Sequence, residues 1–236
     1  MDILLVGYGK MGKTIEPIAT SRGHRIVGKI DVQTGEAFTA STKADVAIEF
    51  TQPESAVDNI KQCIDRQIPV VVGTTGWHHR LDEVTEYCQK KNGTVFYSSN
   101  YSMGVNLFFK LNEYLAKLMN RYPEYEVSMD ETHHTQKKDA PSGTAITLAQ
   151  SLIKHLDRKK KWINTDSDNS DDLVIRSFRV DPAPGTHIVK YHSAIDDIEI
   201  KHHAYSREGF AKGAVLVAEW LPGRKGMLTM DDFLQF

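Results

Sequence analysis

The architecture of this 236-residue chain follows from one segment, Val6-Gly7-Tyr8-Gly9-Lys10-Met11-Gly12. It comes after a short apolar run, Ile3–Val6, and opens a helix-like segment, Met11–Ser21. In the pattern G-x-G-x-x-G the first glycine permits a tight turn and the second lets a pyrophosphate approach the backbone. The third lets the helix pack on the strand. Because a helix N-terminus also offers free N–H groups to an anion, the segment predicts a dinucleotide-binding βαβ unit.

A second interpretation of the same loop stays open. The phosphate loop of nucleotide triphosphatases, G-x-x-x-x-G-K-T, is matched by Gly7, Gly12, Lys13 and Thr14. Gly9 is required only by the dinucleotide pattern, and Asp31 ends the second predicted strand about 20 residues on, where a ribose-binding carboxylate belongs. A triphosphatase also needs an Asp at the end of a later strand to hold magnesium, whereas Glu49 lies inside the predicted strand Ala44–Phe50. These observations favour the dinucleotide.

Strand and helix patterns alternate through the first 100 residues. Strands are expected at Ile3–Val6, Arg25–Ile30, Ala44–Phe50, Pro69–Val72 and Thr94–Tyr97, with helices over Met11–Ser21, from about Pro53 through Asp65, and over Leu81–Lys91. Strands that alternate with helices across short loops predict an α/β fold with a Rossmann-type, doubly wound parallel sheet. Its ligands should bind at the carboxyl ends of the strands.

The pattern changes after Asn100 and indicates a second, α+β domain. Helices are expected over Val105–Leu118, Ser142–Leu156 and Gly209–Leu221, strands at Tyr125–Asp130, Leu173–Val180, His187–Ser193 and Asp197–Ala204, and a polar surface loop over Asp157–Asp172. Strands with few helices between them predict a mixed or antiparallel sheet. We expect a dinucleotide-binding domain over residues 1–101, to which 213–236 return through a short capped helix, and a substrate-binding and oligomerisation domain over 102–212.

Composition excludes several classes of protein. Lys and Arg total 29 and Asp and Glu total 31, and this balance argues against a nucleic-acid partner. The longest apolar runs, such as Ile68–Val72, are far too short to span a membrane, and the first residues lack the basic region of a signal peptide. The two cysteines, Cys63 and Cys88, lie in helix-like segments and form no disulfide framework. We therefore expect a cytoplasmic protein without a membrane partner.

The densest chemistry lies in Glu131–Thr144, which reads E-T-H-H-T-Q-K-K-D-A-P-S-G-T. Histidine moves protons near neutral pH, lysine is a cation that can donate one, and a helix start offers N–H groups to a carboxylate. This inventory suits a small dicarboxylate substrate that is protonated during reaction. The alternatives are a solvated basic loop and a metal site built from His133, His134, His202 and His203. Adjacent histidines rarely chelate one ion, so we expect no metal.

Five segments resemble the dihydrodipicolinate reductase family over nearly the whole chain. They are V-G-Y-G-K-M-G at Val6–Gly12, E-F-T-Q-P at Glu49–Pro53, V-G-T-T-G at Val72–Gly76, S-S-N-Y-S-M-G at Ser98–Gly104 and H-H-T-Q-K-K-D-A-P-S-G-T-A at His133–Ala145. The resemblance implies reduction of 4-hydroxy-tetrahydrodipicolinate to tetrahydrodipicolinate, with loss of water, in lysine and diaminopimelate biosynthesis. It implies NADH or NADPH as cofactor and a homotetramer formed through the second domain.

The resemblance also implies roles for individual residues. The pyrophosphate would be held by Gly7, Tyr8, Gly9, Lys10, Met11 and Gly12, the ribose by Asp31, and the nicotinamide side by Gly73, Thr74, Thr75, Ser98, Ser99, Asn100 and Tyr101. His133 would be the catalytic acid/base, Lys137 the proton donor, and His134, Gly143 and Thr144 the holders of the substrate carboxylates. Arg207 and Phe210 would lie in a hinge-side segment near the cofactor.

Two features bear on cofactor and substrate. Asp31 is followed by Val32 and not by a basic residue, which favours NADH over NADPH unless Lys10 or Lys13 reaches the 2′-phosphate. Gln136 stands where many relatives have a third basic residue, and the span from Asp31 to the next strand is short. Another NAD-dependent reductase and a non-catalytic dinucleotide sensor are the competing functions. The sensor would not need His133 and Lys137.

Overall fold

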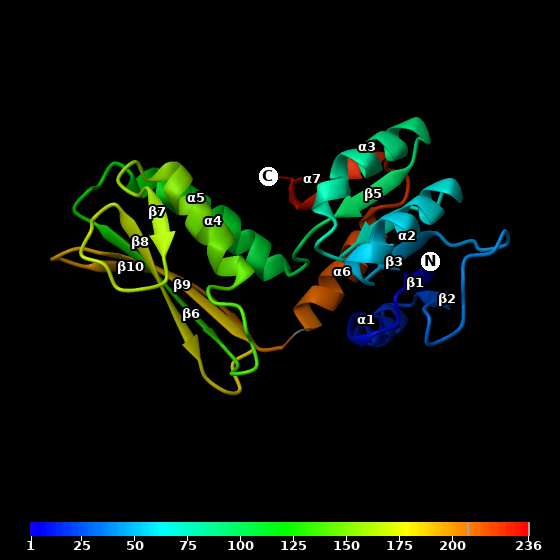
Figure 1. Cartoon of the computed structure of the whole chain (residues 1–236), viewed down its shortest axis with the longest axis horizontal. Coiled ribbons are helices and arrows are strands. Elements are labelled where there is room, and N and C mark those ends of the chain that lie inside the picture. The colour runs from blue at the N-terminus through cyan, green and yellow to red at the C-terminus, as the bar shows by residue number, and fades with distance from the viewer. Residues whose placement is uncertain (207, 236) are drawn as a thin grey trace. The chain divides into compact units, whose positions relative to one another are not determined.

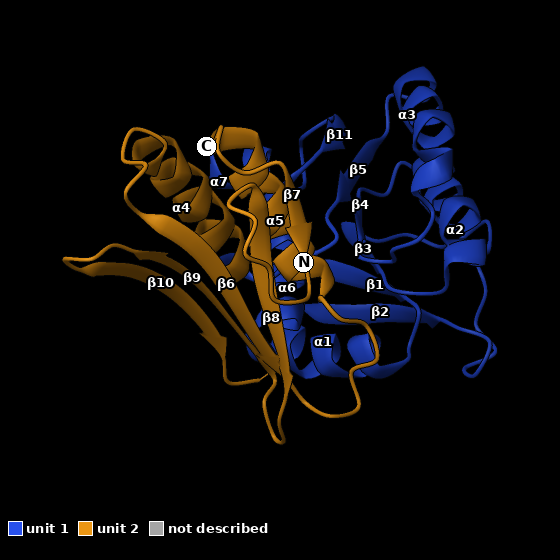
Figure 2. Cartoon of the chain, turned by 60° about the vertical axis from the view of Figure 1, so that its left-hand side comes forward, with its two compact units in different colours: residues 1–103, 208–236 blue, residues 104–207 orange. Residues whose placement is uncertain are grey.

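The computed structural model describes residues 1–206 and 208–235. Its contacts divide the chain into two compact units, residues 1–103 with 208–236 and residues 104–207 (Figure 2). The expected boundaries were 101/102 and 212/213. The second differs because the helix α6 (Glu208–Trp220) lies in unit 1 from its first residue.

Unit 1 is built on a six-stranded sheet in the order β11-β5-β4-β3-β1-β2, whose strands are all labelled in Figure 2. Figure 1 colours the chain by residue number and labels β1, β2, β3 and β5 of this sheet. Its strands are β1 (Asp2–Val6), β2 (Arg25–Ile30), β3 (Val46–Glu49), β4 (Val70–Val72), β5 (Thr94–Tyr97) and β11 (Gly226–Leu228). Every neighbouring pair in this sheet is parallel. The expected doubly wound, Rossmann-type sheet is therefore confirmed. From β1 the chain adds β2 on one side of the sheet and then β3, β4 and β5 on the other side. Such a topological switch point between β1 and β3 leaves a crevice at the carboxyl ends of the strands.

Helices cover both faces of this sheet. One face is covered by α1 (Lys10–Ser21), α6 and α7 (Met230–Leu234), and the other by α2 (Pro53–Asp65) and α3 (Leu81–Lys90), which follows the short helix η1 (His78–Arg80). The free thiols of Cys63 and Cys88 are buried in α2 and α3, as expected. The apolar strand residues that face these helices form two buried clusters. Burial on both faces explains why the strands read as continuous apolar runs.

Unit 2 is built on a five-stranded sheet in the order β10-β9-β6-β8-β7. Its strands are β6 (Glu126–His133), β7 (Lys161–Ile163), β8 (Asp172–Arg179), β9 (Gly185–His192) and β10 (Asp197–Ala204). The β10–β9 and β9–β6 pairs are antiparallel and the β6–β8 and β8–β7 pairs are parallel, which confirms the expected mixed sheet. Helices α4 (Met103–Met119) and α5 (Gly143–His155) share its apolar core.

Two local expectations were wrong, and one strand was not expected. The edge strand β7 lies in the segment expected to be a surface loop, and the edge strand β11 lies where no element was expected. The strand expected to end at Asp130 continues to His133, so the first residues of the polar segment belong to β6. The capped helix expected near the end of the chain is confirmed as α7, where Thr229 and Asp232 form a capping box. None of the described helices is long and apolar enough to cross a membrane.

Candidate active site

The glycine loop has the geometry that its pattern predicts. Gly7 has φ +94°, and a Cβ there would lie 2.0 Å from the Phe50 carbonyl oxygen. A Cβ on Gly12 would lie 2.4 Å from the carbonyl oxygen of Gly7, so only glycine lets α1 approach the strand. A Cβ on Gly9, by contrast, would meet no described atom within 4 Å. Gly9 immediately precedes α1 and leaves open space at the helix N-terminus, where a pyrophosphate fits.

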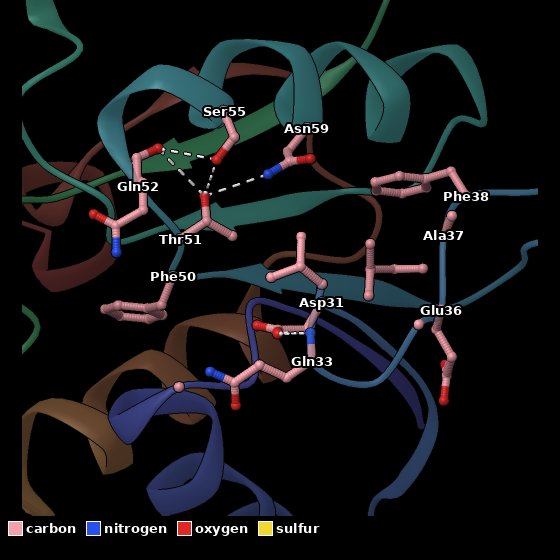
Figure 3. A pocket seen from close by; sticks show the side chains of 14 residues that line it. Asp31, Gln33, Glu36, Ala37, Phe38, Phe50, Thr51, Gln52, Ser55 and Asn59 are labelled. Carbon is pink, nitrogen blue, oxygen red and sulfur yellow. Dashed lines mark hydrogen bonds between the residues drawn. The ribbon is translucent and has the colours of Figure 1, made fainter.

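Two adjoining cavities extend from this loop. One, of about 660 Å³, extends from Gly9 to Asp31 and Phe38, and Figure 3 shows its lining side chains. The other, of about 380 Å³, extends from Gly9 to Thr75 and includes Lys10 and Met11. Both are lined by Gly9, Phe50, Thr51 and Gln52. Together they span the carboxyl ends of β2, β1, β3 and β4, an elongated space suited to a dinucleotide.

Asp31 follows β2 and lines the larger cavity. Its carboxylate accepts hydrogen bonds from the backbone N–H groups of Tyr8 and Gln33, each at 2.7 Å. These bonds, that from Tyr8 first, lower the pKa of Asp31. The carboxylate is therefore charged at neutral pH. Glu36 also lines this cavity, and its own carboxylate accepts a hydrogen bond from the Lys29 backbone N–H at 2.7 Å.

Tyr8 and its neighbours form the wall beside α1. The Tyr8 hydroxyl donates to Glu16, and the ammonium of Lys29 lies 4.3 Å from the Tyr8 ring centroid. Lys29 also pairs with Glu16 at 2.8 Å. The positive charge of Lys29 is thus already balanced by the Glu16 carboxylate.

The residues predicted for the nicotinamide side follow β4 and β5. Gly73 and Thr75 line the smaller cavity, and buried Thr74 accepts a hydrogen bond from the Thr51 N–H at 2.7 Å. In the second segment, Ser98 bonds with the backbone of Asn100, and Ser99 is exposed. Tyr101 is 2% exposed, and its hydroxyl donates to the Val72 carbonyl at 2.7 Å. The Tyr101 side chain therefore holds the end of β4 and offers little surface to a ligand.

In unit 2, the end of β6 carries a polar cluster on the face that packs against the helices. Along this face Val127 and Met129 join the apolar core, and Glu131 and His133 continue it with buried polar side chains. Glu131 lies opposite His187 of β9 and Ser177 of β8, and His133 lies opposite Arg179 of β8. The period of two along a strand thus brings a carboxylate, two imidazoles and a guanidinium together.

Glu131 is the centre of this cluster. Its Oε1 accepts from Arg179 Nη2 at 3.0 Å and from the backbone N–H of Ser142 at 3.2 Å. Its Oε2 lies 3.1 Å from His133 Nδ1 and 3.8 Å from His187 Nε2. Burial alone would raise the pKa of Glu131, but the nearby His133, Ser142 and Arg179 outweigh burial and hold this pKa well below its usual range.

His187 is the neutral member of the cluster. Burial, together with the nearby His133, lowers its pKa to about 4. Its Nε2 lies 3.1 Å from the hydroxyl of Ser142, the residue that caps α5 by accepting from the Ala145 N–H. His187 therefore packs between the sheet and the start of α5 as an uncharged imidazole.

The predicted substrate residues surround this cluster. Lys137 lies in the turn after β6, and its ammonium is 2.8 Å from both carboxylate oxygens of Asp139. Half-buried His134 accepts the Lys137 N–H on its carbonyl, and Gly143 and Thr144 are the first residues of α5. A Cβ on Gly143 would meet no described atom within 4 Å, so the helix start is accessible. The structure thus brings His133, Lys137 and the α5 start to one end of unit 2.

Arg179 holds the loop that carries these residues. Its guanidinium donates to the backbone carbonyls of Lys137 and Asp139, at 3.3 and 2.6 Å, besides its bond to Glu131. Gln136, which takes the place of a basic residue, lies exposed in this loop. Arg207, predicted to lie near the cofactor, is outside the described residues.

The metal alternative takes a different form from the one considered on sequence. Among the described residues, the ligand atoms of Glu131, His133 and His187 lie within 4.8 Å of one another, whereas His134, His202 and His203 do not join this group. The Arg179 guanidinium already compensates the charge of Glu131. A metal ion would have to compete with that cation, so the arrangement favours acid–base chemistry.

Several residues of both sites were given no role from the sequence. Thr51 and Gln52, which follow β3 at the switch point in unit 1, and Glu131 in unit 2 lie within quoted segments, and Arg179 and His187 of unit 2 lie outside them. The signal for Thr51 and Gln52 is their place after the strand that adjoins β1. For Glu131, Arg179 and His187, the signal is the register of β6 with β8 and β9, which no single segment reveals.

Comparison with protein families gives two matches. A family model described as "Dihydrodipicolinate reductase, N-terminus" matches residues 1–101, and one described as "Dihydrodipicolinate reductase, C-terminus" matches residues 104–234. Among curated proteins, a 4-hydroxy-tetrahydrodipicolinate reductase of Christiangramia forsetii is 46% identical over 234 residues, covering 99% of this chain and 98% of the relative. One of Methanoregula boonei is 33% identical over 243 residues, covering 96% and 94%.

Solved structures support the same fold. A dipicolinate-bound dihydrodipicolinate reductase from Paenisporosarcina sp. TG-14 superposes with a TM-score of 0.77 at 21% identity, covering 99% of both chains. An amine dehydrogenase from Mycobacterium smegmatis has a TM-score of 0.60 at 9% identity, covering 98% of this chain and 95% of that one. At these identities the structural similarity establishes the architecture alone.

Proposed function

This chain belongs to the dihydrodipicolinate reductase family, and we propose that it reduces 4-hydroxy-tetrahydrodipicolinate to tetrahydrodipicolinate with a reduced nicotinamide dinucleotide. The observation that carries the proposal is the match of both family models along nearly the whole chain, with a 46% identical reductase over 99% of it. The substrate takes up a hydride and a proton and releases water, while the cofactor is oxidised. This is the lysine and diaminopimelate biosynthetic step that the family implies.

Family membership also decides between the two interpretations of the glycine loop. The family's amino-terminal domain binds a nicotinamide dinucleotide, so the triphosphatase alternative is set aside. The open space at Gly9 and the cavities on either side of it fit such a cofactor. In this assignment the loop Gly7–Gly12 holds the pyrophosphate, Asp31 the adenosine ribose, and Gly73–Thr75 with Ser98–Tyr101 the nicotinamide half. When bound, the nicotinamide supplies the hydride.

The preferred cofactor in this proposal is NADH. A 2′-phosphate would enter the cavity that is lined by the Asp31 carboxylate, and Lys29 is already paired with Glu16. Repulsion between like charges at close range disfavours the phosphate. The measurement is kcat/KM with NADH and with NADPH under the same conditions. A higher value with NADH is expected, and a strong preference for NADPH would contradict the proposal.

The proton is supplied by unit 2 in this proposal. His133 acts as acid/base and Lys137 as proton donor, and Asp139 holds the Lys137 ammonium in place. The N–H groups at the start of α5, at Gly143 and Thr144, together with His134, hold the substrate carboxylates. A basic loop of this kind neutralises the charge that develops on the ring as it is reduced.

Two variants test these roles. His133→Gln and Lys137→Met should each lower kcat by about 10²- to 10⁴-fold, the usual contribution of a positioned acid or base, and should change KM far less. Lys154→Met makes the same change on the exposed side of α5 and is the control. The assay adds freshly made substrate to protein and NADH and follows the loss of absorbance. Near-normal kcat in both variants would mean that the chemical step uses other residues.

We propose a homotetramer assembled through unit 2. The strand β10 is an edge of the mixed sheet and carries the partly exposed Ile198. An unpaired strand edge is a ready surface for association with another chain. Light scattering coupled to gel filtration should give the mass of four copies of the 26.6 kDa chain, and a monomer at micromolar concentration would contradict the assembly.

A further inference from the structure

We propose that Glu131 is the positioning residue of the acid/base His133, fixing which ring nitrogen carries the hydrogen and coupling the imidazole to the start of α5. This inference rests on the proposed function, in which His133 exchanges a proton with the substrate. It concerns a residue that lies inside the strand and not in the loop.

The geometry around the two side chains carries the argument. Oε2 of Glu131 lies 3.1 Å from Nδ1 of His133, and both atoms are buried. Among the described residues neither atom has a formed hydrogen bond, and the 3.1 Å contact joins them without the alignment of one. Two buried polar atoms left unpaired this close together are satisfied most readily by bonding to each other. A carboxylate only accepts, and Nδ1 can satisfy it only by carrying the hydrogen. When His133 Nδ1 is paired with Glu131, Nε2 is therefore the ring nitrogen left to exchange a proton with the substrate.

The other carboxylate oxygen is already committed. Oε1 accepts two hydrogen bonds, from Arg179 Nη2 and from the backbone N–H of Ser142. Ser142 is the cap of α5, whose next two residues are the proposed carboxylate holders Gly143 and Thr144. One side chain thus joins the imidazole that exchanges the proton to the helix start that holds the substrate. A displacement of Glu131 would misplace both.

His187 completes the enclosure of this pair. It lies opposite Glu131 on β9, its Nε2 is 3.8 Å from Oε2, and its ring is 5.1 Å from that of His133. On the far side of His133, a Cβ on Gly185 would come within 3.2 Å of Nε2. The imidazole of His133 is therefore held in a narrow slot, and its orientation depends on the carboxylate behind it.

The variant Glu131→Gln converts this arrangement into a testable change. The two donors at the Oε1 position, Arg179 and the Ser142 N–H, select the amide oxygen of glutamine. The amide nitrogen then points at His133 and donates to Nδ1, which must lose its hydrogen. The hydrogen moves to Nε2, so Nε2 can no longer accept a proton in the neutral ring. The imidazolium that would donate one is also disfavoured, because its Nδ1–H would face an amide donor instead of a carboxylate. A similar carboxylate-to-amide change in a serine protease triad acts through the wrong tautomer.

The first readout is kinetic. We expect Glu131→Gln to lower kcat by roughly 10- to 100-fold, part of the contribution of a positioned acid, with KM changed less than threefold. Glu126→Gln is the matched control, because it removes a carboxylate from the same strand, where Glu126 pairs with Lys159, and should keep wild-type kcat. Unchanged kcat in Glu131→Gln would overturn the inference, and so would an equal loss in Glu126→Gln.

The second readout needs no enzymatic activity and does not use Glu131→Gln. Nitrogen-15 NMR of histidine-labelled wild-type protein reports the tautomer of His133, assigned by the signal missing from His133→Gln. We expect hydrogen on Nδ1 in the neutral ring, and hydrogen on Nε2 would overturn the inference even if Glu131→Gln fails to fold. If wild-type protein has the Nδ1 tautomer but does not reduce the substrate, the proposed function fails and the positioning role of Glu131 stands.

Discussion

Two glycines of one loop are constrained by different neighbours. Gly12 faces the protein, because a Cβ there would lie 2.4 Å from the Gly7 carbonyl oxygen. Gly9 faces open space, and its φ of −77° is negative, but its ψ of −151° lies just beyond the extended region of other residues. The fold therefore excludes a side chain at position 12, whereas at position 9 it leaves space that the proposed ligand would fill.

This difference predicts opposite results for two alanine variants. Gly12→Ala should lower Tm by several degrees, since an overpacked site costs about 1–3 kcal/mol and each kcal/mol shifts Tm by roughly 2–4 °C in a chain of this size. Gly9→Ala should lower Tm less than Gly12→Ala, because its Cβ meets no described atom, and should weaken NADH at least about tenfold, or 1.4 kcal/mol. Differential scanning fluorimetry and fluorescence titration measure both. An unaltered NADH affinity in Gly9→Ala would remove the loop from the cofactor site.

His187 predicts a pH dependence of stability. Its pKa is lowered to about 4 by burial and by His133, whereas an unfolded histidine titrates near pH 6.5. Below pH 6.5 the unfolded chain gains a proton that the folded chain does not, so stability is full above pH 6.5 and falls until about pH 4. At pH 5.0 the loss is about 2 kcal/mol.

Urea unfolding at pH 7.5 and pH 5.0 measures this loss. His187→Gln keeps a polar side chain but cannot titrate, so its free energy of unfolding should change less between the two pH values. An equal change in wild type and His187→Gln would assign the acid sensitivity to other groups.

At the scale of elements, β6 shows why a strand can be mistaken for a loop. Its polar end, Glu131–His133, reads as a loop because charged and imidazole groups suggest solvent. The period of two continues nevertheless, and Glu131 and His133 are as buried as Val127 and Met129. Partners on β8 and β9 satisfy the polar groups, and those partners are far away in sequence. The edge strands β7 and β11 were missed for another reason, because three residues are too few to show a period.

The loop after β6 depends on an element beside it in the sheet, and this predicts a phenotype for Arg179→Lys. Lysine keeps the charge next to Glu131 but lacks the fork that reaches the carbonyls of Lys137 and Asp139. The loss of one such bond, about 1 kcal/mol, should raise the substrate KM roughly 3- to 10-fold and speed amide exchange across residues 134–141.

Arg176→Lys is the control for this variant. Arg176 lies on the same strand, is exposed, and faces Asp130 and Asp166 at 3.8 Å. It should leave both KM and exchange at wild-type values. Equal exchange in the two variants would show that Arg179 does not order the loop.

At the scale of the molecule, the sequence predicted the two kinds of sheet and the order of most elements, because the glycine loop and the alternation of strands and helices are local signals. It also predicted that His133 and Lys137 would lie near the α5 start, since they are neighbours along the chain. It did not predict Tyr101 as a buried residue that bonds Val72, nor Glu131 and Arg179 as partners. Those contacts depend on which strands are neighbours in the sheet. The roles of His133, Lys137 and Glu131 in the reaction stay predictions.

The assignment of one ligand to each unit leads to a double dissociation. Gly9→Ala should weaken NADH binding and keep the affinity for dipicolinate, the aromatic dicarboxylate bound by the Paenisporosarcina relative. His134→Ala should do the reverse, because its change lies in unit 2 and removes a proposed holder of the substrate carboxylates. Each variant should nevertheless turn over substrate more slowly at low ligand concentrations, since the reaction uses both ligands. Calorimetric titration of each variant with each ligand measures the four affinities. If His134→Ala lost NADH and kept dipicolinate, the assignment of ligands to units would be reversed.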